Sequence, residues 1–518
     1  WADHWVSYWQ DVLAENPGIL KPMLNNTGPF RWYLHQALRH NLAMDRFATE
    51  LILMEGSAMG GGPAGFALAT ENDVPMAAKA HVIGRAFLGV ELACARCHDA
   101  PHHPYLQKDL FSLGAMLAQK PLTVPASSSI PAAELERRPL VEVTLRAGAK
   151  VSPAWPFTDL APAELPPGVL RDAANPRERL AAILTSPHND RFAQVLVNRL
   201  WKRYLGWGIV EPVDDWSVVE PSHPDLLAYL ARELALHDYD MKHLARLVLN
   251  SHAYQRQARP DGSKETVAAE RLFAAPARRR LSAEQLLDTL FVSVGKEFHS
   301  EELCFDPEGR RPANQMLNLG APRRAWEFTS LSNERDRPAL ALPVAQTIVD
   351  LLVMYGWRDA RQFPLTVREE TPTPLQPLLL ANGTVGSRIT RLSDDSTITE
   401  LCLEDRPLAE LIDAVFLRIL TRRPSVAERE LFTELLADGY ADRRLLDAPR
   451  NPLRRATQAM NVSWSNHLSP EATRLKLELE RAVRQGDPPT QRLRQDWRER
   501  MEDMLWALVN APEFMFVP

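Results

Sequence analysis

Apolar side chains recur at helical spacing in two long stretches of this chain, and this periodicity limits the fold more than any other feature. Near the start, Trp5, Tyr8 and Trp9 fall on one face of a helix. The run RFAQVLVNRLWKRYLG, at 191–206, repeats the pattern. Because each apolar stripe must pack against another element, the sequence predicts a mainly α protein with two helical blocks.

Prolines crowd the segment between the two blocks. Since proline has no amide donor and interrupts helices, we expect residues 121–175 to form a connector. Its run PLVEVTLRAG alternates apolar residues at Val141, Val143 and Leu145, which favours a short β-strand. The predicted organisation is a helical domain over residues 1–120, this connector, and a helical companion domain over residues 176–518.

Helix starts are marked by capping residues. Ser282 and Gln285 have the spacing of a capping box. Ser222 is the predicted N-cap of a helix whose first turn contains Pro224. Residues 360–400 show no regular period and are predicted to be irregular.

The charge balance excludes some classes of protein. Lys and Arg number 60 against 66 Asp and Glu, a formal net charge of −6. A nucleic-acid partner needs a clustered basic excess, so we expect none. The longest apolar runs are also too short to cross a membrane.

The chain has only 4 cysteines, too few for a disulfide scaffold. Cys304 and Cys402 lie far apart in sequence, and their spacing does not decide whether they pair.

The other two cysteines form the motif Cys94-Ala-Arg-Cys97-His98. This is the attachment signature of c-type haem. Residues three and four apart share one face of a helical turn, so Cys94 and Cys97 can each form a thioether with one haem vinyl group. His98 then serves as the axial ligand of the haem iron.

Two alternatives to haem remain open for this cluster. With His102 or His103 added, the motif offers the four nitrogen and sulfur ligands of a zinc site, or an iron site. The protein would then be a non-haem metal protein or enzyme. In the other alternative the Cys-x-x-Cys pair is structural, and the chain is a binding scaffold.

The run EPVDDWSVVEPSHP contains a second set of candidates, Asp214, Asp215 and His223. Paired carboxylates near a histidine can bind a metal or act as general acid and base. The simpler interpretation is a turn followed by helix capping. Arg199 is predicted to be a buried or partly buried ion-pair partner of an acid such as Asp214 or Asp215.

Long stretches of the chain resemble one family. The resemblance rests on FLGVELACARCHDAPHHPYLQKDLFSLGAMLA, on the stretch from LAAILTSPHNDRFAQVLVNRL to LNSHAYQRQ, on RRRLSAEQLLDTL and on MEDMLWALVNAPEFMF. These runs are similar to planctomycetal cytochrome-c-like exported proteins, which carry the domains of unknown function fifteen-forty-nine and fifteen-fifty-three. Cys94, Cys97 and His98 match the haem signature of that family.

The resemblance implies a periplasmic or otherwise extracytoplasmic protein that binds haem c covalently. It implies electron transfer or another redox role with an unidentified partner protein, and it names no reaction, so whether the chain is an enzyme stays undecided. Two departures stand out. The family has His-Pro-Phe one residue after Cys-His, whereas Asp99 to His102 intervene here before His103. WADHW resembles the interior of the first domain, so we expect an N-terminal portion to be missing.

Overall fold

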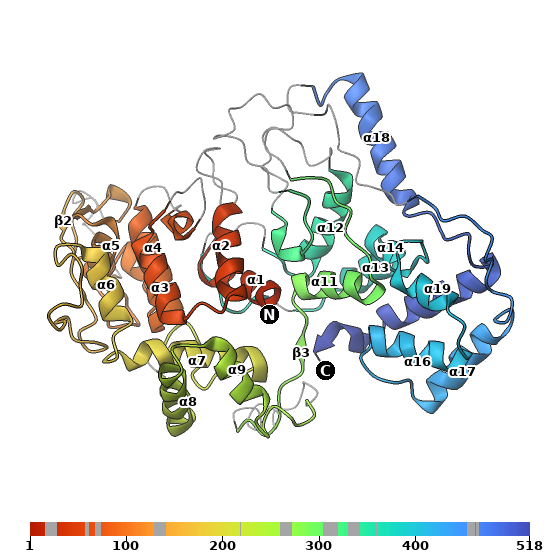
Figure 1. Ribbon diagram of the computed structural model, residues 1–518. Coiled ribbons are helices and arrows are strands. Elements are labelled where there is room, and N and C mark those ends of the chain that lie inside the picture. Colours follow the sequence, from red (N-terminus) through yellow and green to blue (C-terminus); the bar gives the residue numbers. More distant parts are fainter. Residues whose placement is uncertain are drawn as a thin grey trace. The chain divides into compact units, whose positions relative to one another are not determined.

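The computed structural model describes most of the chain. The described residues are 1–15, 28–56, 62–67, 74–128, 141–217, 219–258, 272–303, 320–329, 342–358, 361, 363–369, 371–452, 462 and 466–517. Contacts divide the chain into two compact units. Unit 1 contains Trp1–Arg278 and Ala360–Val367, and unit 2 contains Arg279–Asp359 and Arg368–Pro518. In Figure 1, Trp1–Arg278 of unit 1 run from red through yellow to yellow-green, and unit 2 runs from green to blue.

Unit 1 is helical. Its α-helices are α1 (Ala2–Val12), α2 (Gly28–Arg39), α3 (Met44–Leu53), α4 (Pro75–Ile83), α5 (Gln107–Ala118), α6 (Pro176–Leu184), α7 (Asp190–Leu205), α8 (Pro224–Leu236) and α9 (Met241–Leu249). Shorter helical turns lie at Pro63–Ala67, Gly84–Leu88, Cys94–Arg96 and Ala126–Ser128. Helix α4 packs on α5, α1 on α2, α3 on α6, and α7 on both α8 and α9 (Figure 1).

Aromatic rings join the two predicted helical blocks inside unit 1. Trp9 of α1 is almost fully buried and lies 5.3 Å from Phe47 and 6.0 Å from Phe87 between ring centroids. Phe87 in turn lies 5.9 Å from Phe192 of α7. Because such rings bury large apolar areas, they hold the first block against the start of the second. The helical period at Trp5, Tyr8 and Trp9 is confirmed by α1.

The predicted strand at Val141, Val143 and Leu145 is wrong. The short β element lies a little later, where β2 (Lys150–Val151) pairs antiparallel with β1 (Leu122–Thr123). Thr144 and Leu145 pair with a side chain instead, because the amide oxygen of Gln107 accepts hydrogen bonds from their backbone N–H groups.

Unit 2 is a second helical body. Its α-helices are α11 (Ala283–Val294), α12 (Pro343–Met354), α13 (Leu375–Asn382), α14 (Thr384–Thr390), α15 (Thr397–Leu403), α16 (Leu408–Ile419), α17 (Val426–Ala437), α18 (Pro470–Gln485) and α19 (Gln495–Val509). Short 3-10 turns lie at Ala325–Glu327 and Pro512–Met515, and β3 (Arg279–Arg280) pairs with β4 (Phe516–Val517). The buried core is centred on α11, α12, α16 and α19.

Local signals in unit 2 had mixed outcomes. The capping box of Ser282 and Gln285 is confirmed at the start of α11. The prediction that residues 360–400 are irregular is wrong, because α13, α14 and the start of α15 fall there. These helices have 8, 7 and 7 residues, too few for a periodic pattern to stand out.

The mainly α fold is therefore confirmed, and the β structure found among the described residues is limited to two small two-stranded sheets. The two units are defined by contacts in space, whereas the predicted domains were defined by sequence pattern. The domain boundaries at 120 and 176 therefore stay a prediction. Within the described ranges, no helix is both long and apolar enough to cross a membrane.

Candidate functional site

The Cys-x-x-Cys-His motif forms a tight turn on unit 1. Cys94–Arg96 is a 3-10 helix, and the backbone N–H groups of Cys97 and His98 both donate to the carbonyl oxygen of Cys94 at 3.1 Å. Cys94 is half-buried, Cys97 is exposed, and neither is in a disulfide. Both thiols therefore remain available for covalent chemistry.

The ring of His98 is held in one tautomer. Its Nδ1 lies 2.8 Å from the carbonyl oxygen of Asp99. A carbonyl oxygen only accepts hydrogen bonds, so Nδ1 carries the proton. Nε2 then keeps its lone pair, which is how metal-binding histidines are oriented when the other ring nitrogen donates to the protein.

The carboxylate of Asp99 fastens the loop to its surroundings. Asp99 is buried, and its Oδ1 accepts hydrogen bonds from the backbone N–H of Gln107 at 2.7 Å and from Thr144 Oγ1 at 3.0 Å. The backbone N–H of Asp99 donates to the carbonyl oxygen of Glu142 at 2.8 Å. Thr144 and Glu142 of the connector thus hold the C-terminal side of the motif in place through hydrogen bonds.

The N-terminal side of the motif is held by buried polar groups. The backbone N–H of Leu92 donates to Nδ1 of His81 at 3.2 Å, and Glu91 forms an ion pair with Arg85 at 2.9 Å. Burial lowers the pKa of His81 to about 3. The His81 ring is therefore neutral near pH 7, as its acceptor role requires.

Of the two acids predicted as partners of the buried Arg199, Asp214 forms the ion pair, at 2.8 Å. Arg199 also donates to the carbonyl oxygens of Ala86 at 2.8 Å and Arg85 at 2.6 Å, and to Thr366 Oγ1 at 2.6 Å. Thr366 comes from the Ala360–Val367 segment, which belongs to unit 1 although it is distant in sequence.

Two arginines determine the charge of Asp214. Its second carboxylate oxygen pairs with Arg85 at 2.9 Å. Burial alone would raise the pKa of Asp214, but Arg199 and Arg85 outweigh it and lower the pKa to about 2. Since Arg85 also pairs with Glu91, a continuous chain of charges joins Arg199 to the segment just before Cys94.

The residues after Asp214 contact the chain before and after the Cys-x-x-Cys-His motif. Asp215 Oδ1 accepts from Ser217 Oγ at 2.6 Å, and Ser217 Oγ lies 2.7 Å from His103 Nδ1. The backbone N–H of Trp216 donates to the carbonyl oxygen of Gly89 at 2.9 Å. Residues 214–217 therefore contact the chain on both sides of the Cys-x-x-Cys-His turn.

Gly89 is required at this contact. Its φ is +63°, and a Cβ atom there would lie 2.4 Å from Trp216 Cδ1. A side chain at position 89 would thus meet both backbone strain and a steric clash.

His223 does not join the two aspartates. It is half-buried, and its Nδ1 lies 3.0 Å from Ser222 Oγ. The predicted N-cap at Ser222 is wrong, because His223 occupies the cap position of α8 and makes no side-chain cap. Ser222 Oγ donates to the carbonyl oxygen of Ile209 instead.

The cysteines and histidines of the motif do not converge on one point in this structure. His102 is exposed, and His103 is turned toward Ser217 and Asp215. Among the described residues, the one group of three His, Cys, Asp or Glu side chains with ligand atoms within 4.8 Å of one another lies elsewhere, on α8 and α9. Cys304 lies outside the described residues, so its pairing with Cys402 stays open, and Cys402 is buried.

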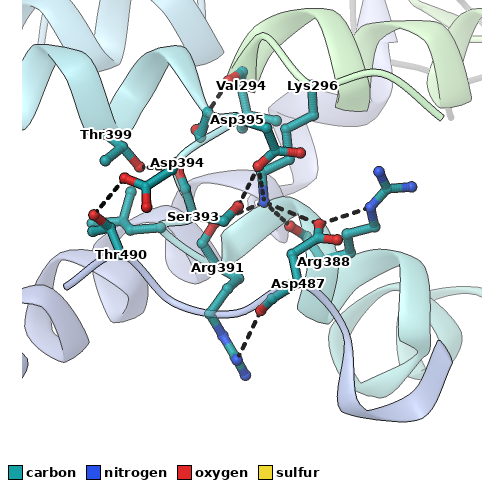
Figure 2. A network of polar contacts seen from close by, with 12 residues as sticks. Val294, Lys296, Arg388, Arg391, Ser393, Asp394, Asp395, Thr399, Asp487 and Thr490 are labelled. Carbon is teal, nitrogen blue, oxygen red and sulfur yellow. Dashed lines mark hydrogen bonds and ion pairs between the residues drawn. The ribbon is translucent and has the colours of Figure 1, made fainter. Parts of the chain in front are cut away.

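Unit 2 contains a buried polar centre that the sequence did not indicate. Lys296 has a fully buried side chain, and its Nζ donates to the carbonyl oxygens of Arg388 at 2.7 Å and Arg391 at 2.9 Å (Figure 2). Asp487 and Asp395 lie 3.7 and 3.9 Å from the same nitrogen. Burial lowers the pKa of Lys296 to about 8, although both carboxylates oppose the shift.

The carboxylates of this centre have further partners. Asp395 also contacts His299 and Ser393, and Asp487 pairs with Arg388 at 2.9 Å. Burial opposes ionisation of Asp395, but its contacts with His299 and Lys296 hold its pKa well below the usual range. The adjacent acids Asp394 and Asp395 were the available sequence signal, but nothing in the sequence places Lys296 beside them.

A pocket that is partly open to solvent adjoins this centre. Its lining includes the apolar side chains of Phe291, Ile348 and Leu479, and also Arg388 and Glu301. Arg388 is occupied by Asp487, and Glu301 accepts from the first N–H groups of α12. Arg388 and Glu301 therefore serve the fold, and the Cys-x-x-Cys-His loop is the stronger candidate site.

Two family models match this chain. Residues 1–121 match PSCyt2, a protein of unknown function (DUF1549), and residues 176–436 match PSD1, a protein of unknown function (DUF1553). No curated protein and no solved structure matches the chain. The Cys-x-x-Cys-His turn lies in the first match and the Asp214–Ser217 segment in the second. The chain belongs to the PSD1 family and carries, ahead of that domain, a domain of the planctomycete cytochrome-c-like family PSCyt2.

Proposed function

We propose that this chain is an extracytoplasmic protein that binds haem c covalently and has an electron-transfer or redox role. Cys94 and Cys97 form the thioethers, and His98 is the axial ligand. The observation that carries the proposal is the geometry of this turn. Two thiols without a disulfide lie beside a histidine whose Nδ1–H donates a hydrogen bond to a carbonyl oxygen. A c-type haem needs these groups in this order.

The residues fit such a group. Asp99, Gln107 and Thr144 fix the turn from one side, and His81 fixes Leu92 on the other. When bound, the haem iron would supply one-electron chemistry. Cys94 and Cys97 would hold the group covalently, and the Asp99 carbonyl oxygen orients the His98 ring. The Arg199–Asp214 pair supports the loop through Arg85 and Glu91.

The location outside the cytoplasm follows from the proposed chemistry. Haem is attached to Cys-x-x-Cys-His motifs outside the cytoplasm, so covalent haem and export stand together. The electron donor or acceptor would be a separate redox protein. The net charge of −6 favours such a partner over a nucleic acid.

The test is to express the chain in the periplasm of a host with the cytochrome c maturation system. Haem that survives acid–acetone extraction, and a reduced alkaline pyridine spectrum, are expected for the parent chain. Cys94→Ser and Cys97→Ser should each reduce covalent attachment, and the double variant should abolish it. His98→Gln should change the spectrum of the native protein, whereas His102→Gln, which alters an exposed neighbour, should not.

Absence of covalent haem in a host that matures a reference cytochrome c overturns the proposal. Stoichiometric zinc or iron that depends on Cys94 and Cys97 would then support the non-haem metal protein. If neither haem nor metal is found, the structural scaffold is the better description.

A further inference from the structure

The corner between α8 and α9 gathers three side chains with metal-binding groups. Glu233 and His237 are one helical turn apart at the end of α8, and His243 lies in the first turn of α9. One ligand atom from each residue lies within 4.8 Å of the other two. The group lies apart from the Cys-x-x-Cys-His motif in sequence and shares no residue with it.

The spacing of these groups suits a metal ion better than hydrogen bonds. Glu233 Oε2 lies 3.7 Å from His237 Nδ1 and 3.8 Å from His243 Nε2. Both distances are too long for hydrogen bonds. Ligands at about 2.1 Å from a tetrahedral ion are roughly 3.4 Å apart, so a small inward movement would close the carboxylate and the rings around a cation.

His243 also has an unused nitrogen at this corner. Its Nε2 is buried and has no hydrogen-bond partner among the described residues. The two imidazole rings stack with centroids 3.7 Å apart and an angle of 14° between their planes. Because a buried polar atom without a partner costs free energy, a cation at this position would remove a penalty as well as form a bond.

The backbone fixes the corner before any ligand binds. Asp238 and Tyr239 both have φ of +54°, and the Tyr239 N–H donates to the Leu234 carbonyl oxygen at 2.9 Å. Asp240 caps α9 by accepting from the N–H groups of Lys242 and His243. Little ordering is therefore needed to bring the histidines together.

We infer that Glu233, His237 and His243 form a binding site for a first-row transition-metal ion, with Zn²⁺ as the reference ion. Two imidazoles and one carboxylate suit zinc and its neighbours, whereas Ca²⁺ and Mg²⁺ prefer oxygen ligands. The side chain of His237 is 46% exposed, so the remaining coordination positions face water. His237 Nδ1 donates to the Glu233 carbonyl oxygen at 2.9 Å, so metal binding at this nitrogen must break that hydrogen bond and displace its proton. This cost makes the site weaker than a closed four-ligand site.

The site is tested by calorimetric titration of the full chain with ZnCl₂. Binding of one zinc ion at this corner is expected, together with a rise in melting temperature. Glu233→Gln, His237→Gln and His243→Gln should each weaken this binding at least tenfold. His252→Gln changes an exposed histidine of the same unit outside the cluster and should leave it unchanged.

Zinc at the Cys-x-x-Cys-His motif is distinguished by the Cys94→Ser/Cys97→Ser variant. That variant should keep the corner site, so loss of haem and loss of this site are separate results. The inference is overturned if zinc binding is absent, or if it is the same in the three corner variants as in the parent chain. It is also overturned if the cysteine variant removes all zinc binding.

Discussion

The Cys-x-x-Cys-His turn of unit 1 and the polar centre around Lys296 in unit 2 place reactive groups in opposite environments. Cys97 is exposed and Cys94 half-buried, with free thiols. Lys296 is fully buried, and its ammonium group donates to two carbonyl oxygens. One region leaves its chemical groups available, and the other uses them to hold helices together.

The turn nevertheless depends on a buried network of its own. Arg199, Asp214 and Arg85 form this network, which reaches the turn through the ion pair of Arg85 with Glu91. Arg199 donates five hydrogen bonds to side chains and carbonyl oxygens among the described residues. An accessible site thus rests on a support resembling the Lys296 centre. The difference between the regions is that unit 1 adds an exposed motif to its buried network.

The largest expected effect on stability comes from removing Arg199, which supports the exposed motif. Arg199→Met should lower the free energy of unfolding by about 4 kcal/mol, because it leaves Asp214 and two carbonyl oxygens without their main donor. Chemical denaturation followed by circular dichroism measures this loss.

The absorption spectrum of any bound haem provides the control for Arg199→Met. It should stay unchanged in the fraction that folds, because Arg199 does not touch the thiols or His98. A changed spectrum with unchanged stability would show instead that Arg199 belongs to the site itself.

Lys296→Met tests the buried centre of unit 2 in the same way. We expect a loss of about 3 kcal/mol, since Asp395 and Asp487 lose a buried cation and two carbonyl oxygens lose a donor. Arg481→Met, which removes an exposed cation from α18, should change stability by less than about 0.5 kcal/mol. Equal effects of the two variants would mean that the centre adds no stability.

The pH dependence of stability sharpens the comparison further. The pKa of Asp214 is lowered from 3.8 to about 2 in the folded chain, so the folded state binds its proton less readily than the unfolded state. The stabilisation is complete above about pH 4 and is lost as the pH falls toward 2, by about 2 kcal/mol.

Denaturant titrations of the parent chain and Asp214→Asn between these pH values measure the contribution of Asp214. The difference between their unfolding free energies should shrink as the pH falls. A difference that is constant with pH would show that Asp214 titrates normally.

The smallest expected effect on stability concerns residues 100–105, which follow the motif. Ser217→Ala removes the hydroxyl that joins His103 to Asp215 and should cost about 1 kcal/mol. Hydrogen exchange should increase mainly at residues 100–105. An increase of the same size throughout unit 1 would mean that Ser217 supports the whole unit and not residues 100–105 alone.

Much of the local structure could be predicted from sequence because it depends on neighbouring residues. The helical stripe of α1, the capping box of Ser282 and the Cys94–His98 motif all have fixed short spacings. The wrong predictions arose where residues distant in sequence decide the local structure. The segment around Val143 alternates like a strand, but the distant Gln107 takes its N–H groups.

The sequence by itself determined the mainly α class, the family and the positions of the thiols and His98. It also predicted that Arg199 pairs with Asp214 or Asp215, although not that Arg85 and Thr366 are further partners of Asp214. Only the tertiary structure decided which distant groups meet: Lys296 with Asp395 and Asp487, and His243 with Glu233 across a helix corner. The physical reason is that an ion pair or ligand set depends on distance in space, which sequence spacing specifies only within a turn or two of helix.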